Sequence, residues 1–176
     1  MNLDQRIKES IRDVPDFPEK GIVFKDITPL LLDPELCKMI VEGICTGFED
    51  QKIDAVCAIE SRGFFIGMLI AQKLMVPFIP ARKKGRLPGE VVEFAYELEY
   101  GKGVIEIHKA VIQKGWNVMI HDDLLATGGT AMAASQLVRA EGGNVAGYSF
   151  VVELDFLEGR KRILDLSEKI ISLVHY

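Results

Sequence analysis

The stretch "VMIHDDLLATGGT", residues 118–130, decides the fold of this chain. Its apolar beginning is typical of a buried strand, and "GGTAMAAS", which overlaps its end, is typical of the start of a helix. We therefore predict a strand-to-helix turn that contains the paired acids Asp122 and Asp123. Turns of this kind are where ligands bind in open α/β sheets.

This turn combines two features that suit different parts of one ligand. Small residues let backbone N–H groups approach a phosphate, and the helix N-terminus adds free donors and a favourable dipole. Carboxylates accept hydrogen bonds from vicinal hydroxyls, or hold a Mg²⁺ ion shared with a sugar. The turn is neither GxGxxG nor a Walker loop, and it predicts a site for ribose 5-phosphate. The acids are Asp122 and Asp123, and the phosphate residues are Ala126, Thr127, Gly128, Gly129 and Thr130.

Two alternatives stay open for this stretch. The acids could simply end a strand while the glycines start a helix. His121 could also join Asp122 and Asp123 in a metal site, although a histidine bonded to the backbone at a strand end is the blander outcome.

Composition limits the class of protein. The 176 residues predict one domain, and the formal net charge of -5 argues against a broad nucleic-acid surface. No apolar run approaches the roughly 20 residues that span a bilayer, and the mixed-charge start "MNLDQRIKES" does not resemble a signal peptide. Three cysteines without metal or CxxC spacing suit a reducing compartment, so we expect a cytoplasmic protein without a membrane partner.

Strand and helix patterns alternate from residue 54 onward, which predicts an α/β fold with a central, mainly parallel sheet flanked by helices. Residues 82–103 are different: they are charged, rich in Gly and Pro, and alternate between polar and apolar at 91–98. That pattern predicts a hairpin or flap with one apolar face. The predicted helices are 3–12, 34–48, 61–74, 128–143 and 157–164, and the predicted strands are 54–60, 76–81, 115–121, 144–154 and 169–176.

The opening stretch resembles the 5-phosphoribosyl 1-pyrophosphate (PRPP) motif of the type I phosphoribosyltransferases. The form "DDLLATGGT" resembles the adenine branch of that family in particular. Further segments match the branch in the expected order: "VPDFPEKGIVFKDITPLL" (14–31), "ESRGF" (60–64), "RKKGRLPG" (82–89) and "LEYG" (98–101). The resemblance implies one domain over 1–176, with an N-terminal hood at about 1–33 and a flexible catalytic flap at about 82–103.

The resemblance also implies an activity and partners. Adenine and PRPP would give AMP and pyrophosphate in purine salvage, with Mg²⁺ as cofactor and a homodimer as the assembly. Two other hypotheses remain: a type I transferase for a 6-oxopurine, xanthine or orotate, and a nucleotide-sensing regulator that lost the chemistry. The intact flap and the lack of an added binding module weigh against the regulator.

The resemblance places pyrophosphate contacts in two segments. Ser61 and Arg62 follow a strand and precede a helix, where an arginine can fork onto pyrophosphate oxygens. Arg82, Lys83 and Arg86 belong to a basic cluster that would bind pyrophosphate partly across a dimer interface, with Lys83 the favoured residue. The alternatives are a surface arginine for Arg62, and a solvated charge run or an RNA contact for the cluster.

The far arm of the flap carries the predicted proton chemistry. By resemblance, Tyr100 packs over PRPP and Glu99 faces the base, where a shielded carboxyl could handle a purine proton. Ala126 supports this choice, because 6-oxopurine transferases have an aspartate at that position. Otherwise Glu99 is a surface charge of the flap.

The predicted base pocket is the segment "GIVFKDI". Phe24 can stack on adenine, and backbone groups of Val23 and Lys25 can read its edge. Lys25 differs from the arginine common in the family, and Phe24 could instead be plain core packing. Elsewhere, Arg160, Lys161 and Arg162 resemble an exposed helix face, and His108 and His175 show no partner pattern.

Overall fold

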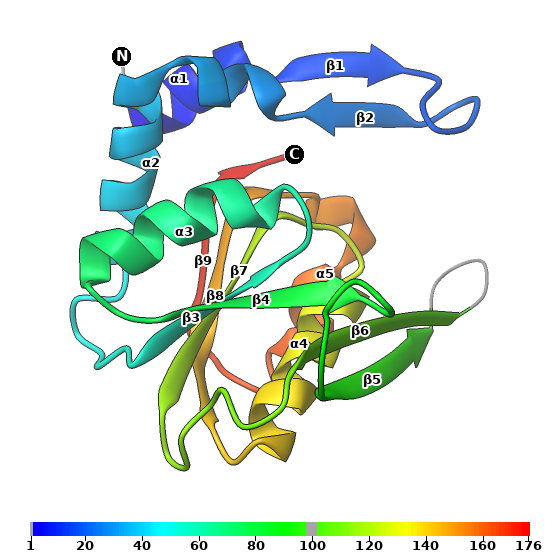
Figure 1. Ribbon diagram of the computed structural model, residues 1–176. Helices are drawn as coiled ribbons and strands as arrows, with labels where there is room; N and C mark the ends of the chain where they lie inside the picture. The colour runs from blue at the N-terminus through cyan, green and yellow to red at the C-terminus, as the bar shows by residue number, and fades with distance from the viewer. Residues whose placement is uncertain (1, 98–101) are drawn as a thin grey trace.

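A seven-stranded sheet lies between two helical layers in the computed structural model, which describes residues 2–97 and the chain from 102 to 176 (Figure 1). The strand order is β5-β6-β4-β3-β7-β8-β9. The strands are β3 (Ala55–Ile59), β4 (Phe78–Lys83), β5 (Val91–Glu97), β6 (Lys102–His108), β7 (Asn117–Leu125), β8 (Asn144–Glu153) and β9 (Ile170–His175).

The predicted α/β fold with a mainly parallel sheet is confirmed. Strands β4, β3, β7, β8 and β9 are mutually parallel, and β6 runs antiparallel to both β4 and β5. The crossovers contain α3 (Gly63–Leu74), α4 (Gly129–Ala140) and α5 (Gly159–Ile163). Since β4 and β7 flank β3 on opposite sides, the carboxyl ends of β3 and β7 form the switch point where such sheets bind ligands.

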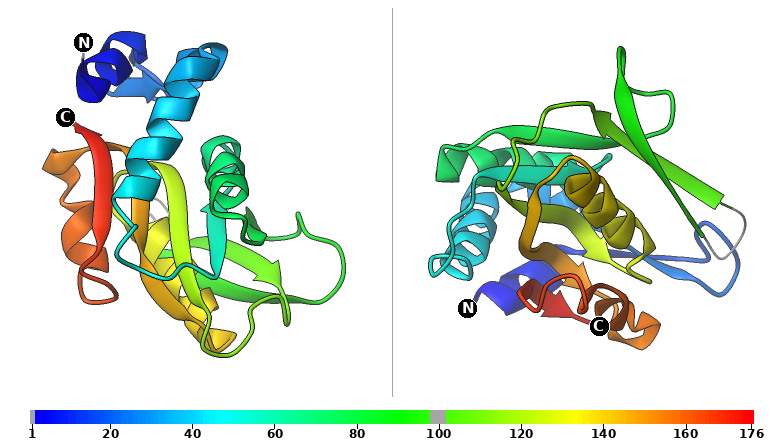
Figure 2. Two further views of the ribbon diagram at one scale, coloured as in Figure 1. Left: turned by 90° about the vertical axis from the view of Figure 1, so that its left-hand side faces the viewer. Right: turned by 90° about the horizontal axis from the view of Figure 1, so that it is seen from below.

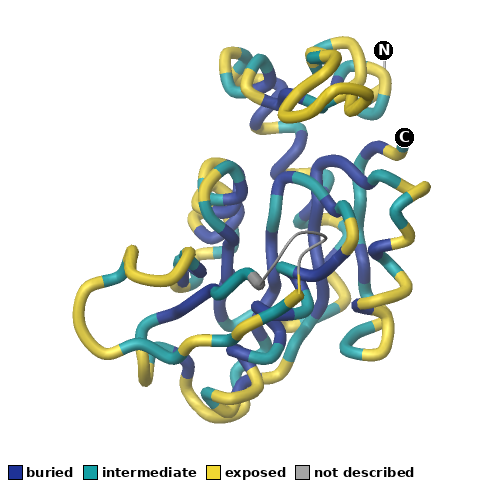
Figure 3. Tube along the Cα trace, turned by 90° about the vertical axis from the view of Figure 1, so that its right-hand side faces the viewer, coloured by how far each residue is buried: buried dark blue, intermediate teal, exposed yellow. Residues whose placement is uncertain are grey.

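Side chains of the central strands alternate between two apolar clusters. In β7, Val118 and Ile120 join the cluster under α4, whereas Met119 joins the cluster under α2 (Pro34–Thr46), α3 and α1 (Leu3–Ser10). A strand buried on both faces reads as a continuous apolar run, as "VMI" does. Figure 3 shows these buried strands against exposed loops at the periphery.

Helix starts follow the local sequence. Asp33 caps α2 by accepting a hydrogen bond from the Leu36 N–H, and Pro34 occupies the first turn as predicted. Helix α4 ends at Ala140, and Gly142 follows with a left-handed φ of +85°.

No helix in the described part of the chain is both long and apolar enough to cross a membrane.

The N-terminal segment forms a hairpin that the sequence patterns did not predict. Strand β1 (Arg12–Pro15) pairs antiparallel with β2 (Val23–Asp26), and the 3-10 helix η1 (Thr28–Leu32) follows. Each strand has only four residues; β1 is largely exposed, and the one buried residue of β2 is the acid Asp26, so neither strand carries an apolar alternation. We call this hairpin the hood hairpin. Figures 1 and 2 show that it projects on the same side of the molecule as the β5–β6 flap.

The flap forms as a hairpin at the predicted place, with longer arms. Val92, Phe94 and Tyr96 pack their side of β5 against the cluster under α4, as the alternation predicted. The far arm continues to His108, and β4 runs on to Lys83 before the basic loop. The flap therefore stands directly beside α4.

Candidate active site

Strand β7 continues through the paired acids, which the sequence analysis placed in the turn. Asp122 is paired with Phe150 and Leu125 with Glu153, because β8 is long enough to hold β7 in register to its end. The turn is thus limited to Ala126, Thr127 and Gly128, and α4 begins at Gly129. The acids lie on a rigid strand immediately before it.

The turn is shaped by the backbone of α5. Gly128 has a left-handed φ of +75°, and a Cβ atom there would lie 2.5 Å from the Gly159 carbonyl oxygen. A Cβ on Gly159 would in turn collide with the Ala126 carbonyl oxygen. The turn and the start of α4 surround a small cavity of about 70 Å³, which Asp122 also lines. Backbone donors, two threonine hydroxyls and a helix N-terminus thus converge on one space suited to a phosphate.

The two acids differ in surroundings. Asp123 is buried, and its Oδ2 atom lies 2.8 Å from Arg62 Nε, as an ion pair without an aligned hydrogen bond. Asp122 is partly buried, and its Oδ1 atom accepts a hydrogen bond from the Asp123 N–H. Burial and the charge of Asp123 raise the pKa of Asp122 well above its ordinary value. Burial also raises the pKa of Asp123, and Arg62 opposes that shift.

A second cavity joins the acids to the basic segment. It has a volume of about 100 Å³ and is lined by Glu60, Lys83, Tyr96, Asp122 and Thr130, among others. It shares Asp122 and Thr130 with the phosphate cavity. The structure therefore places Lys83 in one cavity with Asp122 and with Thr130 at the start of α4.

The arginines around this site point elsewhere than expected. Arg82 Nε donates to Glu60 at 2.7 Å, and Arg82 also donates to the Arg86 carbonyl oxygen. The guanidinium of Arg62 lies against Asp123, with its Cζ 4.8 Å from the centroid of the Phe24 ring. Ser61 lies in the exposed turn before α3. In this structure Arg62 and Arg82 are held by acids, so their pyrophosphate contacts stay a prediction.

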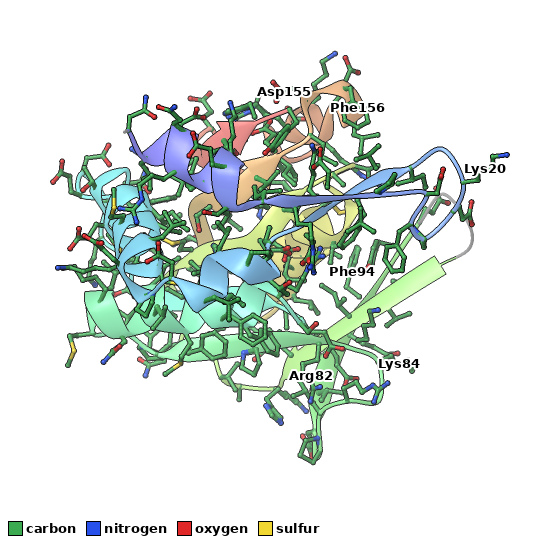
Figure 4. All side chains as sticks on the ribbon, turned by 90° about the horizontal axis from the view of Figure 1, so that it is seen from above. Lys20, Arg82, Lys84, Phe94, Asp155 and Phe156 are labelled. Atoms are coloured by element: carbon green, nitrogen blue, oxygen red, sulfur yellow. The ribbon has the colours of Figure 1, made fainter. Side chains whose placement is uncertain are left out.

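Phe24 of the hood hairpin lies against Arg62, which in turn pairs with Asp123. Phe24 is partly buried, packs edge-on against Phe17 at 5.2 Å, and belongs to neither apolar cluster. The Lys25 side chain turns away: its Nζ bonds to Asp13 and lies 4.0 Å from the Tyr176 ring centroid. Val23 is exposed. Among the described residues Phe24 thus does not pack in the core, and the Arg62 guanidinium lies over its ring, so stacking on a base stays a prediction. Seen from above, the hairpin with Lys20 at its tip extends on the same side as the flap strand that carries Phe94 (Figure 4).

Glu99 and Tyr100, the predicted proton carrier and PRPP contact, lie outside the described residues. Their roles stay predictions.

His121 is fully buried between β7 and α3. Its Nδ1 atom lies 2.9 Å from Ser149 Oγ, and its Nε2 atom has no hydrogen-bond partner among the described residues. Burial lowers the pKa of His121 to about 3, so the ring is neutral at physiological pH. Its partner is a side-chain hydroxyl rather than the backbone, and it belongs to no group of metal-binding side chains in the described ranges.

Comparison with proteins of known name identifies the family to which the chain is similar. Residues 34–170 match the family described as phosphoribosyl transferase domain. A protein of Cytophaga hutchinsonii named adenine phosphoribosyltransferase is 51% identical, covering 99% of this chain and 96% of that protein. The crystal structure of adenine phosphoribosyltransferase from Thermoanaerobacter pseudethanolicus has a TM-score of 0.95 at 46% identity, covering 99% of this chain and 100% of that one.

The chain belongs to the adenine phosphoribosyltransferase family. The resemblance proposed from the sequence is confirmed, and so is the type I phosphoribosyltransferase fold. A further relative, from Saccharomyces cerevisiae, was crystallised with adenine and an imino-altritol bisphosphate. That structure has a TM-score of 0.91 at 40% identity and covers 97% of this chain and 98% of that one.

Sequence reasoning missed one acid that supports the site of this family member. Glu106 on β6 is buried, and its Oε1 atom accepts backbone N–H groups of Arg86 and Leu87 at 2.9 Å each. Burial alone would raise the pKa of Glu106, but the backbone donors of Leu87, Gly85 and Arg86 together lower it. The only sequence signal was an acid inside the apolar run "VIEIH". Its effect is to hold the basic loop that follows Lys83.

Two further expectations were wrong. Arg160 does not belong to an exposed helix face: it donates two hydrogen bonds to buried Glu153, at 2.9 and 2.7 Å. Both histidines without a partner pattern do have partners: His175 Nδ1 lies 2.9 Å from Asp155 Oδ1, and His108 Nε2 lies 3.0 Å from the Pro88 carbonyl oxygen. In each case the partner lies more than six residues away along the chain.

Proposed function

We propose that the protein transfers the phosphoribosyl group of PRPP to N9 of adenine, releasing pyrophosphate and giving AMP for purine salvage. One observation carries the proposal. The end of β7 presents Asp122 to both the phosphate turn and the Lys83 cavity, so that acids, phosphate donors and a cation meet at one edge of the sheet.

The site can hold a phosphorylated ribose despite its acids. Backbone N–H groups and hydroxyls of the turn bind the 5-phosphate, while Asp122 and Asp123 accept hydrogen bonds from the two ribose hydroxyls. Because Asp123 faces Arg62 and the pKa of Asp122 is raised, the pair repels the phosphate less than two free carboxylates would. This difference resolves the apparent conflict between paired acids and a bound phosphate.

Cations on the other side of the ribose stabilise the departing pyrophosphate. Lys83 is the cation best placed for this, since it lines the cavity next to Asp122. Ser61 and Tyr100 complete the predicted contacts, together with Arg62, whose Nε would stay on Asp123, and with Arg82 and Arg86, whose side chains would reorient on binding. Positive groups aimed at developing charge in a site closed to water are a large source of rate enhancement.

A Mg²⁺ ion fits this donor set. Asp122 and Asp123 provide the carboxylate oxygens that Mg²⁺ prefers, and Asp123 Oδ2, which faces Arg62 Nε at 2.8 Å, has no aligned hydrogen bond among the described residues. We expect the substrate to hold most of the ion and these acids to hold the rest. When bound, the ion would neutralise charge on the pyrophosphate.

Transfer forms the N9–C1′ bond as the C1′–O bond to pyrophosphate breaks, and the purine loses a proton. Phe24 would stack on the ring while backbone groups of Val23 and Lys25 read its edge. Glu99 would take the proton under the closed flap, since the phosphate turn has Ala126 and no acid at that position. Glu99→Gln should lower turnover far more than PRPP binding, and an unchanged rate would end this assignment.

We also propose a cytoplasmic homodimer. Three free cysteines suit a reducing compartment. Helix α3 exposes Phe65, Met68 and Leu69, and Met75 just after it is 87% exposed, so a second copy could cover a large apolar surface. Sedimentation across a dilution series, with activity measured on the same samples, tests this assembly. Full activity in a monomer would refute the idea that a partner completes the site.

A base-competition assay tests the reaction itself. The protein receives PRPP, Mg²⁺ and a mixture of adenine, hypoxanthine, guanine, xanthine and orotate, and the nucleotides formed are resolved. AMP alone is the expected product. Another nucleotide would overturn the base assignment, and no product with PRPP still bound would favour the regulator.

A further inference from the structure

Tyr96 joins the flap to the phosphate turn, and the reaction proposed above gives it no role. This residue is partly buried on β5, and its hydroxyl oxygen lies 3.3 Å from Thr130 Oγ1 at the start of α4. A Cβ atom placed on Gly129 would lie 3.4 Å from Tyr96 Cδ2. One flap side chain therefore bonds to Thr130 and lies within van der Waals reach of any side chain at position 129.

The flap is built around this ring. Gly103 stands opposite Tyr96 in the β5–β6 register, and a Cβ atom there would lie 2.6 Å from Tyr96 Cζ. The ring thus occupies the space that a side chain at 103 would need. Phe94, two residues earlier on the same face of β5, packs on the cluster under α4. Both arms of the flap and α4 therefore fix the position of the Tyr96 ring.

The paired hydroxyls of Tyr96 and Thr130 are suited to hold an anion that binds at the phosphate turn. Each hydroxyl has one proton to donate and two lone pairs that accept. In this structure the Thr130 hydroxyl donates to the Tyr96 oxygen. When a phosphate oxygen accepts the Thr130 proton instead, the Tyr96 proton can turn to Thr130 Oγ1 and hold that hydroxyl in place. Donors in such a chain strengthen one another. Among the described residues, Tyr96 is the only side-chain hydrogen-bond partner of the Thr130 hydroxyl.

We propose that Tyr96 is a positioning residue for the 5-phosphate of PRPP and AMP, acting by orienting the Thr130 hydroxyl. The inference rests on the proposed function only in placing that phosphate on the turn. It follows that binding of the phosphate and docking of the flap on α4 support each other, because one hydroxyl pair takes part in both.

Calorimetric binding of ribose 5-phosphate to the full chain tests this role without adenine or catalysis. Tyr96→Phe removes only the hydroxyl. We expect ribose 5-phosphate to bind roughly three- to ten-fold more weakly, the loss typical of one neutral hydrogen bond. In the assay with both substrates, the KM for PRPP should rise by a similar factor while the KM for adenine stays unchanged.

Tyr148→Phe is the matched control. It removes a tyrosine hydroxyl that bonds to Ser135 Oγ at 2.6 Å in the core beneath α4, away from the turn. It should lower stability and leave ribose 5-phosphate affinity unchanged. Thermal melting of both variants separates a loss of folding from a loss of affinity.

A double-mutant cycle with Thr130→Ala decides between positioning and an independent contact. The proposal requires that Tyr96→Phe cost little more once the Thr130 hydroxyl is gone. Equal losses with and without that hydroxyl, or an unchanged affinity in Tyr96→Phe alone, would overturn it. Wild-type protein that binds ribose 5-phosphate but forms no AMP would overturn the proposed function and leave this test intact.

Discussion

The buried His121 should make the stability of this protein fall as the pH is lowered from about 7.5 to 5. The folded-state pKa is about 3, against an ordinary value of 6.5. The unfolded chain therefore binds a proton below pH 6.5 that the folded chain refuses, so stability falls as pH falls through that range. The slope is about 1.4 kcal/mol per pH unit, which gives a loss of roughly 2 kcal/mol between pH 7.5 and pH 5.

Other groups must be separated from this effect. The pKa of Asp26 is lowered to about 2, so its contribution disappears only below pH 4 or so. Asp122 and Asp123 act in the opposite direction, because a raised pKa makes the folded state bind a proton first. A comparison of the wild-type protein with a His121 variant removes these shared contributions.

The variant His121→Leu/Ser149→Ala replaces both members of the buried pair by apolar groups, so that the serine hydroxyl is not left unpartnered. Urea unfolding at one protein concentration, at pH 7.5, 6.5 and 5, gives the free energy of unfolding for each protein. The wild-type protein should lose about 2 kcal/mol more than the variant between the two ends. Parallel pH profiles would refute the claim that His121 is buried as a neutral ring.

Three further predictions concern the supports of the site. Gly159→Ala should abolish ribose 5-phosphate binding by calorimetry, because the new methyl group collides with the Ala126 carbonyl oxygen of the turn. Glu106→Gln should raise the KM for PRPP several-fold and lower the free energy of unfolding by about 1–3 kcal/mol, since charged acceptors hold backbone donors more strongly. Lys83→Gln should raise the KM for PRPP about ten-fold, whereas Lys84→Gln, which loses an exposed ion pair with Glu93, should change it little; equal effects would refute the special place of Lys83.

The fold was predictable wherever the sequence carried a local period or a local signal. The run "VMI" read as a buried strand because β7 is covered on both faces, and Pro34 marked the start of α2. The alternation at 91–98 gave the flap arm because one face of β5 packs on the core. In each case the decisive contact repeats along a few neighbouring residues.

Features set by distant partners were not predictable. The extension of β7 through Asp122 depends on the length of β8, and the hood strands depend on pairing across a loop. Arg160 resembled a surface charge because its partner Glu153 lies in a different element. The site followed the same division: the phosphate turn was visible as a motif, whereas Glu106 was not, because its role comes from the backbone of a loop that it meets only in three dimensions.

The close approach of the backbone at Gly128 and Gly159 restricts which residues both positions can accept. No side chain takes part in it, so no substitution elsewhere can fill or relieve it, and neither position can drift while the other compensates. The restriction to glycine at position 128 therefore comes from the backbone that lies behind the turn as well as from the turn's own conformation. On a scaffold without that neighbouring helix start, the steric part of the restriction would disappear and only the left-handed φ would remain.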